Sequence, residues 1–105
     1  MNNERIKQIE LQIAQIKREL QMIGEMRPGS LTKQYKDRAA QTGAYYQLSY
    51  THKMKSRTDY VRPQAIKTVR QQVAQYKKFR NLVENWIELA IEHAKLKSAL
   101  NKNND

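Results

Sequence analysis

The chain has 105 residues, no cysteine, and twenty lysines and arginines against ten acidic residues, which gives a net charge of +10. This length predicts a single domain or a small core with helical arms, and the lack of cysteine excludes disulfides and thiolate metal sites. The amino terminus has no apolar signal-like segment, and no stretch approaches the ~20 apolar residues of a membrane span. We therefore expect a cytoplasmic protein with no membrane partner.

Residues 1–26 are predicted to form a coiled-coil helix, helical over residues 3–25, because apolar residues recur there at heptad spacing. The Arg27-Pro28-Gly29 sequence ends the pattern, since proline restricts the residue before it. Isoleucine at both core positions of the heptad favours an oligomer of higher order than a parallel dimer. In the alternative arrangement, this helix packs along the carboxy-terminal helix of the same chain. The predicted seam consists of Ile6, Ile9, Ile13, Ile16, Leu20 and Ile23.

Residues 27–62 are predicted to form a small, basic antiparallel sheet of two or three strands. Residues 44–62 are rich in strand formers and suggest a β-hairpin, and residues 29–36 are a candidate third strand. The register stays open: a two-residue turn at Lys53-Met54 pairs Leu48 with Asp59, and a slip by one residue pairs it with Tyr60.

Alternation along the first hairpin strand assigns its side chains to two faces. Tyr46, Leu48 and Tyr50 form the more apolar set and are expected to be buried against the carboxy-terminal helix. Tyr45 and Gln47 belong to the other set, which is expected to face a ligand.

Residues 63–105 are predicted to form a long helix from Pro63 to about Leu100, with a frayed tail at residues 101–105. From Phe79 onward its apolar residues cover more than half of the circumference, so the helix is expected to be buried from more than one side. Its predicted contribution to the oligomer interface is Leu82, Trp86 and Leu89. The fold class is therefore α+β and mostly α: a coiled-coil helix, a small sheet and a long helix.

The positive charge is concentrated in the middle of the chain. Residues 27–80 contain thirteen lysines and arginines but only two carboxylates, Asp37 and Asp59, a net charge of +11, and the flanking segments are nearly neutral. A basic surface of this kind is typical of proteins that bind polyanions. The predicted partners are therefore DNA, with duplex favoured, and further copies of the chain.

The sequence carries no enzyme signature. Its glycines stand singly, no serine–histidine–acid motif occurs, and the basic middle lacks the carboxylate cluster that metal-assisted phosphoryl chemistry needs. We expect no catalytic residue, no metal site and no cofactor.

Lysines and arginines of the middle segment would neutralise phosphates, and neutral polar side chains would bond phosphates or base edges. The predicted nucleic-acid-binding residues are Lys33, Lys36, Arg38, Tyr45, Gln47, Lys53, Lys55, Arg57, Arg62, Lys67, Arg70, Lys77 and Lys78. Two alternatives stay open. In the first, the protein is an adaptor whose basic surface binds an acidic protein. In the second, it binds single-stranded DNA or RNA by stacking bases on tyrosine.

Three stretches, MRPGSLTKQYKD, GAYYQLSYT and RTDYVRPQAIKTVRQQVAQYKKFRNLVENWIELAIE, carry a resemblance over residues 26–92. They are similar to a small uncharacterised prokaryotic domain family with the pattern RPGSL, GPYYYLSYT, RTRYVP and YRRFR. Genes of that family commonly lie beside transposases, so the resemblance implies an accessory role for a transposase or recombinase on DNA. The present chain departs from the pattern by lacking cysteines in residues 37–43 and by having Lys53-Met54 where the family favours Asp-Gly. The layout of strands and helix is also similar to that of the three-stranded arm-binding domains of phage integrases.

Overall fold

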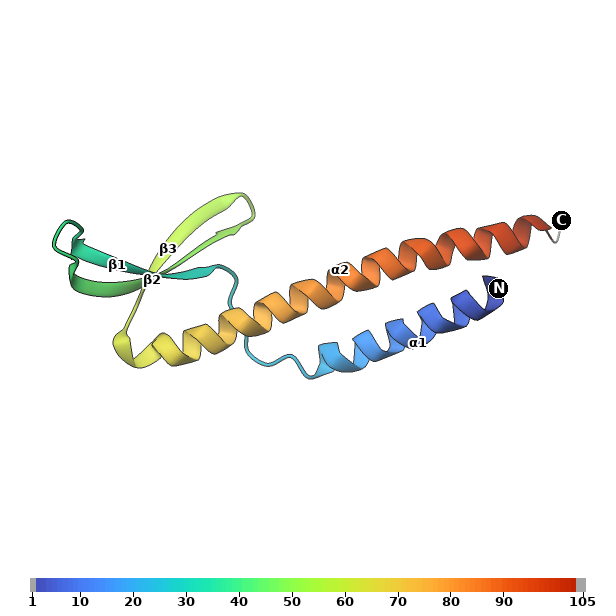
Figure 1. Cartoon of the computed structure of the whole chain (residues 1–105), viewed down its shortest axis with the longest axis horizontal. Helices are drawn as coiled ribbons and strands as arrows, with labels where there is room; N and C mark the ends of the chain where they lie inside the picture. Colours follow the sequence, from blue (N-terminus) through green and yellow to red (C-terminus); the bar gives the residue numbers. More distant parts are fainter. Residues whose placement is uncertain (1, 104–105) are drawn as a thin grey trace. The chain divides into compact units, whose positions relative to one another are not determined.

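The computed structural model describes residues 2–103 and consists of two helices, a three-stranded sheet and one helical turn (Figure 1). The elements in chain order are α1 (Asn2–Gln21), β1 (Ser30–Asp37), β2 (Thr42–His52), β3 (Lys55–Val61), the 3-10 turn η1 (Pro63–Ala65) and α2 (Ile66–Asn103). The predicted fold class, α+β with a sheet between two helices, is confirmed. No helix of the described residues is long and apolar enough to cross a bilayer.

The chain divides into two compact units, and α2 contributes to both. The helical unit combines the residues up to Ile23 with those from Lys78 onward, and the sheet unit comprises residues 24–77.

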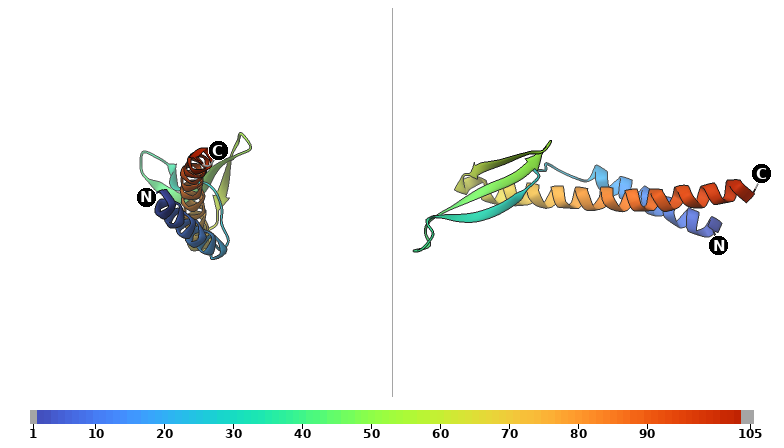
Figure 2. Two further views of the ribbon diagram at one scale, coloured as in Figure 1. Left: turned by 90° about the vertical axis from the view of Figure 1, so that its right-hand side faces the viewer. Right: turned by 90° about the horizontal axis from the view of Figure 1, so that it is seen from above.

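In the helical unit, α1 runs antiparallel to the carboxy-terminal part of α2, as Figures 1 and 2 show. The isoleucine seam of α1 closes this pair, with Ile9 fully buried and Ile6 and Ile16 nearly so, and Leu82 is buried on α2. Charged groups flank the seam: Arg5 donates two hydrogen bonds to Glu92, at 2.6 and 2.8 Å. The heptad pattern thus pairs the two helices within one chain, as in the alternative derived from the sequence.

The same pair contains the residues predicted for the oligomer interface. Ile13, Leu20, Trp86 and Leu89 are half-buried, and the Lys17 ammonium lies 5.3 Å from the centre of the Trp86 ring. Self-association through this seam stays a prediction, and the seam already has an intramolecular partner.

The predicted end of the first helix was wrong, because α1 ends at Gln21 and Ile23 lies beyond it. The last turn tightens through bonds from the Met22 and Ile23 amides to carbonyls three residues earlier, at 3.0 and 3.2 Å. This is a common way for a helix terminus to satisfy its free carbonyls. The chain is then held to α2, where the Gly24 amide donates to Gln75 Oε1 at 2.8 Å.

At the carboxy terminus of the chain, the helix extends further than expected. Residues 101–103 of the predicted frayed tail continue α2, and residues 104–105 lie outside the described residues.

In the sheet unit, the strands lie in the order β1-β2-β3 and both pairings are antiparallel. The candidate third strand is therefore real and is β1. Leu48 pairs with Asp59, so the unslipped register is the correct one. A two-residue turn makes this register possible, with Lys53 at φ 51° and Met54 at φ 65°. Two positive φ angles in a two-residue hairpin turn are typical of type I′ geometry.

The core of the sheet unit lies between one face of the sheet and the first turns of α2. Leu48, Val61, Val69 and Val73 form its buried centre. Tyr46 and Tyr50 pack against this centre together with Leu31, Ala65 and Ile66. The prediction that Tyr46, Leu48 and Tyr50 share the inner face of the sheet is confirmed.

The loop before β1 approaches the sheet so closely that it needs glycine. Gly29 has φ 120°, and a Cβ atom there would clash with the Ser49 carbonyl oxygen. Positive φ and close backbone approach are both conditions that glycine alone meets at low cost.

Candidate nucleic-acid interface

The face of the sheet opposite the core consists of side chains that can form hydrogen bonds, and almost all of them are uncharged. Paired residues in an antiparallel sheet share a face, so the register that places Leu48 inward defines the opposite set. We call this set the outer face: Ser30, Thr32, Gln34, Lys36, Tyr45, Gln47, Ser49, Thr51, Ser56, Thr58 and Tyr60. Tyr45 and Gln47, both predicted to face a ligand, lie on it.

Side-chain hydrogen bonds run across the outer face. The hydroxyls of Ser49 and Thr58 lie 3.4 Å apart, and those of Thr51 and Ser56 lie 3.0 Å apart. Gln34 reaches along β1, where its Nε2 lies 3.4 Å from Thr32 Oγ1. Hydroxyls and amides both donate and accept hydrogen bonds, so this face can adapt to either kind of partner group.

Cations lie around the edge of the outer face, and none lies on the strand at its centre. The central strand β2 contains no lysine, arginine, aspartate or glutamate. The cations of the sheet lie on the two edge strands or in the two turns: Lys33 and Lys36 on β1, Lys55 and Arg57 on β3, Arg38 and Lys53 in the turns. We call these six exposed residues the cationic rim.

The register places some of the rim on the core side of the sheet. Lys33 pairs with Tyr46, Arg57 with Tyr50 and Lys55 with His52, so all three cations share the inner face of the sheet with Leu48. Lys55 and Arg57 were predicted to face the same ligand as Tyr45, which lies on the other face. Because the three cations stand on edge strands and are exposed, their long side chains border the sheet.

The first turns of α2 add two cations beside β1. The Arg70 guanidinium carbon lies 5.6 Å from the centre of the Tyr46 ring, and Lys77 and Arg70 line a cavity of about 310 Å³ with Leu31. Val73 and Ala74 complete this lining.

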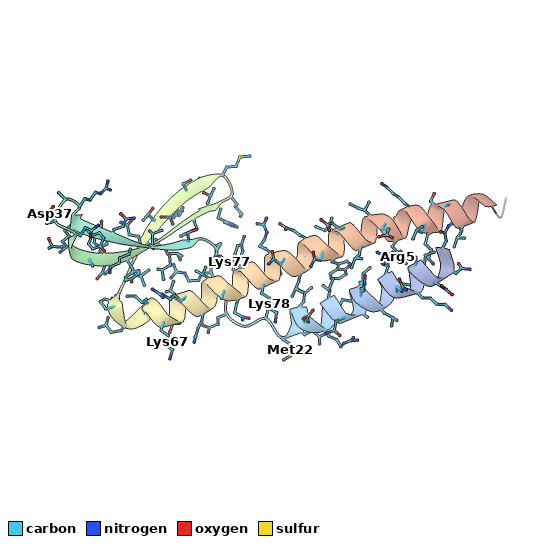
Figure 3. All side chains as sticks on the ribbon, viewed as in Figure 1. Arg5, Met22, Asp37, Lys67, Lys77 and Lys78 are labelled. Atoms are coloured by element: carbon cyan, nitrogen blue, oxygen red, sulfur yellow. The ribbon has the colours of Figure 1, made fainter. Side chains whose placement is uncertain are left out.

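The remaining predicted cations do not join this group. Lys67 extends away from the sheet (Figure 3), about 120° around the helix from Val73. Arg62 is exposed and caps η1, and Lys78 is exposed and belongs to the helical unit.

The few carboxylates of the sheet unit already have partners within the chain. Asp59 accepts a hydrogen bond from Arg27 at 3.1 Å, and Asp37 accepts one from the Ala40 amide at 3.2 Å. Glu25 accepts a hydrogen bond from Gln72 Nε2 at 3.3 Å. The Arg27 guanidinium therefore offsets the charge of Asp59 toward an incoming anion, whereas Asp37 and Glu25 bond only to neutral amides.

Two tyrosines of the outer face border a second depression. Tyr45 and Tyr60 line a cavity of about 450 Å³ with Lys36 and Ala44. Tyr60 is 64% exposed, so its ring is available to a ligand. Among the described residues, no group of three histidine, cysteine or acidic side chains could hold a metal ion.

Sequence reasoning missed most of the outer face. Gln34, Thr58 and Tyr60 were not among the predicted site residues, although Tyr45 and Gln47 were. Their side depends on the register, which the turn sequence left open. Arg27 was missed as well, and its pairing with Asp59 has no local signal because the two residues are far apart in the chain.

No protein-family model, curated protein or solved structure matches this chain.

Proposed function

We propose that this protein is a non-enzymatic, oligomeric accessory protein that binds duplex DNA and assists a transposase or recombinase. One observation carries the DNA-binding part: a neutral, hydrogen-bonding sheet face with a charge-free central strand lies inside a cationic rim. The transposase part rests only on the sequence resemblance described above.

The division between rim and face matches the two kinds of contact that DNA offers. Lysine and arginine neutralise phosphates and supply most of the affinity, whereas amides and hydroxyls read base edges. Glutamine bonds the two major-groove atoms of adenine, and serine and threonine bond several bases. Gln34 and Gln47 are the amides of the outer face.

The dimensions of the sheet agree with this assignment. Its three strands span two interstrand spacings of about 4.8 Å, or roughly 10 Å between the axes of the edge strands. The major groove of B-DNA is about 12 Å wide and admits β-structure. In this arrangement, cations on the edge strands and in the turns lie nearest the two phosphate backbones.

Binding measurements on three ligands test the proposal: a labelled random-sequence duplex, a single strand of the same length and heparin. We expect the protein to bind the duplex more tightly than the single strand at equal salt concentration. Selection from the random-sequence duplexes should yield a preferred sequence. A preference for the single strand would instead support base stacking on Tyr45 and Tyr60. Failure to bind either nucleic acid would favour the adaptor with an acidic protein partner.

A pair of charge-reversed variants makes the test specific. Lys53→Glu with Lys55→Glu alters the rim, and Lys7→Glu with Lys97→Glu makes the same change in net charge within the helical unit. The first variant should lose most of its duplex affinity, and the second should retain most of it.

A further inference from the structure

The helical unit has an apolar surface on α2 that none of its described residues covers. Ile87 and Ile91 are each 52% exposed and lie one turn apart. Arg80, Glu84, Ala94 and Ser98 continue the same row above and below them, at helical spacing. We call this row the Ile87 stripe.

The Ile87 stripe faces away from α1. The α2 residues that contact α1 or close the pair with it include Trp86, Leu89 and Glu92. At about 100° per residue, the mean direction of these three residues lies roughly 180° around the helix from that of Ile87 and Ile91. Within the described residues, the intramolecular helix pair therefore leaves the side chains of Ile87 and Ile91 largely uncovered.

We propose that the Ile87 stripe binds the same stripe of a second copy of this chain, with the two α2 helices antiparallel. The inference deepens the self-association part of the proposed function and identifies a different surface from the isoleucine seam of α1. It does not depend on DNA binding, and its test contains no DNA.

Apolar contacts lie at the centre of the proposed interface. A two-fold axis beside residue 89 places Ile87 of one copy opposite Ile91 of the other, and the contact occurs twice, as in any isologous interface. On one flank, Val83 lies beside Ala94 of the second copy. Ala94 and Ser98 are small, so they permit close approach of the two helices.

The charges select the antiparallel orientation. Glu84 and Lys95 stand on the same flank of α2, about equally far before and after residue 89. The two-fold axis keeps each residue on the same flank of the interface and reverses the direction of the helix. Glu84 of each copy therefore meets Lys95 of the other. A parallel arrangement exchanges the two flanks of the interface, so Glu84 and Lys95 would lie on opposite sides and neither would meet the other's charge. Glu84 already pairs with Arg80 at 3.2 Å in its own chain, and Lys95 of the second copy would extend this pair into a network.

Sedimentation equilibrium of the full chain between about 1 and 500 μM tests the interface. We expect a dimer whose Kd rises at least about tenfold in Ile87→Gln with Ile91→Gln, while the helical circular dichroism signal of the monomer is unchanged. Leu11→Gln is the matched control, because Leu11 is 70% exposed on α1 and lies outside the stripe. It should dimerise like the wild type.

Two charge substitutions test the pairing without touching the apolar centre. Glu84→Lys and Lys95→Glu should each weaken the dimer severalfold, and the two together should restore most of the affinity. A wild-type protein that stays monomeric overturns the proposal, as does a dimer that the isoleucine substitutions leave intact. Loss without restoration in the double charge variant overturns the pairing of Glu84 with Lys95.

Disulfide trapping tests the orientation, because the natural chain contains no cysteine. Chains with Arg80→Cys and chains with Ser98→Cys should cross-link when mixed. Either variant alone should stay uncross-linked, since the rise of about 1.5 Å per residue separates identical positions by roughly 27 Å. Cross-linking of Ser98→Cys with itself would overturn the antiparallel arrangement.

Discussion

Arg70 of α2 lies over the ring of Tyr46 on β2, with its guanidinium carbon 5.6 Å from the ring centre and its Nη2 3.5 Å from the Tyr46 hydroxyl. This contact joins the inner face of the sheet to the first turns of α2. It combines a cation–π interaction with a long hydrogen bond, and it holds one cation of the sheet unit beside β1.

Tyr46→Ala should therefore destabilise the fold. Tyr46 is half-buried and packs on the core of the sheet unit, so we expect a loss of roughly 2 kcal/mol, less than for a fully buried aromatic residue. Tyr45→Ala is the matched control, because Tyr45 is also half-buried but lies on the outer face, and it should cost less than about 1 kcal/mol. Urea unfolding measures both values. Equal losses in the two variants would contradict the assignment of the faces.

Met54→Gly should stabilise the protein. Met54 is 98% exposed and has φ 65°, so the substitution removes no buried contact and relieves a conformation that costs a non-glycine residue roughly 1–2 kcal/mol. The greater chain entropy of glycine offsets part of this gain, which leaves about 0.5–1 kcal/mol. The urea midpoint should rise with an unchanged m-value. Met22→Gly, at an exposed position without positive φ, should not raise the midpoint.

Several parts of the fold could be predicted from the sequence because they depend on local periodicity. Heptad spacing indicated the seam of α1, and alternation assigned Leu48 to the core. The hairpin register could not be predicted, because Lys53-Met54 lacks the Asn-Gly signal that fixes a type I′ turn. The end of α1 was missed for another reason: the apolar pattern continues to Ile23, whereas the chain leaves the helix to meet Gln75, which is distant in sequence.

The candidate site depended on the same unresolved register. Charge indicated the cationic rim directly, since lysines and arginines are recognisable wherever they point. The neutral outer face became visible only when Gln34 and Tyr60 could be assigned to the same side as Gln47. Serine, threonine and glutamine on a strand give no functional signal until their neighbours are known.

Stability should depend on pH through the ion pair of the helical unit. Hydrogen bonds from Arg5 lower the pKa of Glu92 below its ordinary value of 4.5. A carboxylate with a depressed folded pKa stabilises the fold above its unfolded pKa, and this contribution is lost as the pH falls through the folded pKa.

The variant Glu92→Gln isolates this effect. Its free energy of unfolding should lie below that of the wild type at pH 7, and the difference should shrink once the pH falls below about 4.5. Urea unfolding of both proteins at pH 7 and pH 3 checks the expectation. Glu88→Gln, on the same helix, serves as the control for loss of a carboxylate. A difference that grows toward low pH would contradict the sign.

We assign base contacts to the outer face and phosphate contacts to the cationic rim, so a variant of the outer face should change sequence preference and a variant of the rim should change salt dependence. Gln34→Ala with Gln47→Ala should reduce the preference for a selected duplex over a random one by about thirtyfold or more, at about 1–3 kcal/mol for each of the two base contacts. It should leave the salt dependence of binding unchanged, because neither side chain carries charge.

The central claim is tested most directly by the salt dependence of duplex binding in a variant that lacks three rim charges, Lys53→Gln with Lys55→Gln and Arg57→Gln. Log K should fall linearly with log salt for the wild type, and the slope should lose about one unit for each phosphate contact removed. The matched variant Lys7→Gln with Arg18→Gln and Lys97→Gln should keep the wild-type slope. An unchanged affinity and slope in the rim variant would contradict the assignment of this surface to DNA.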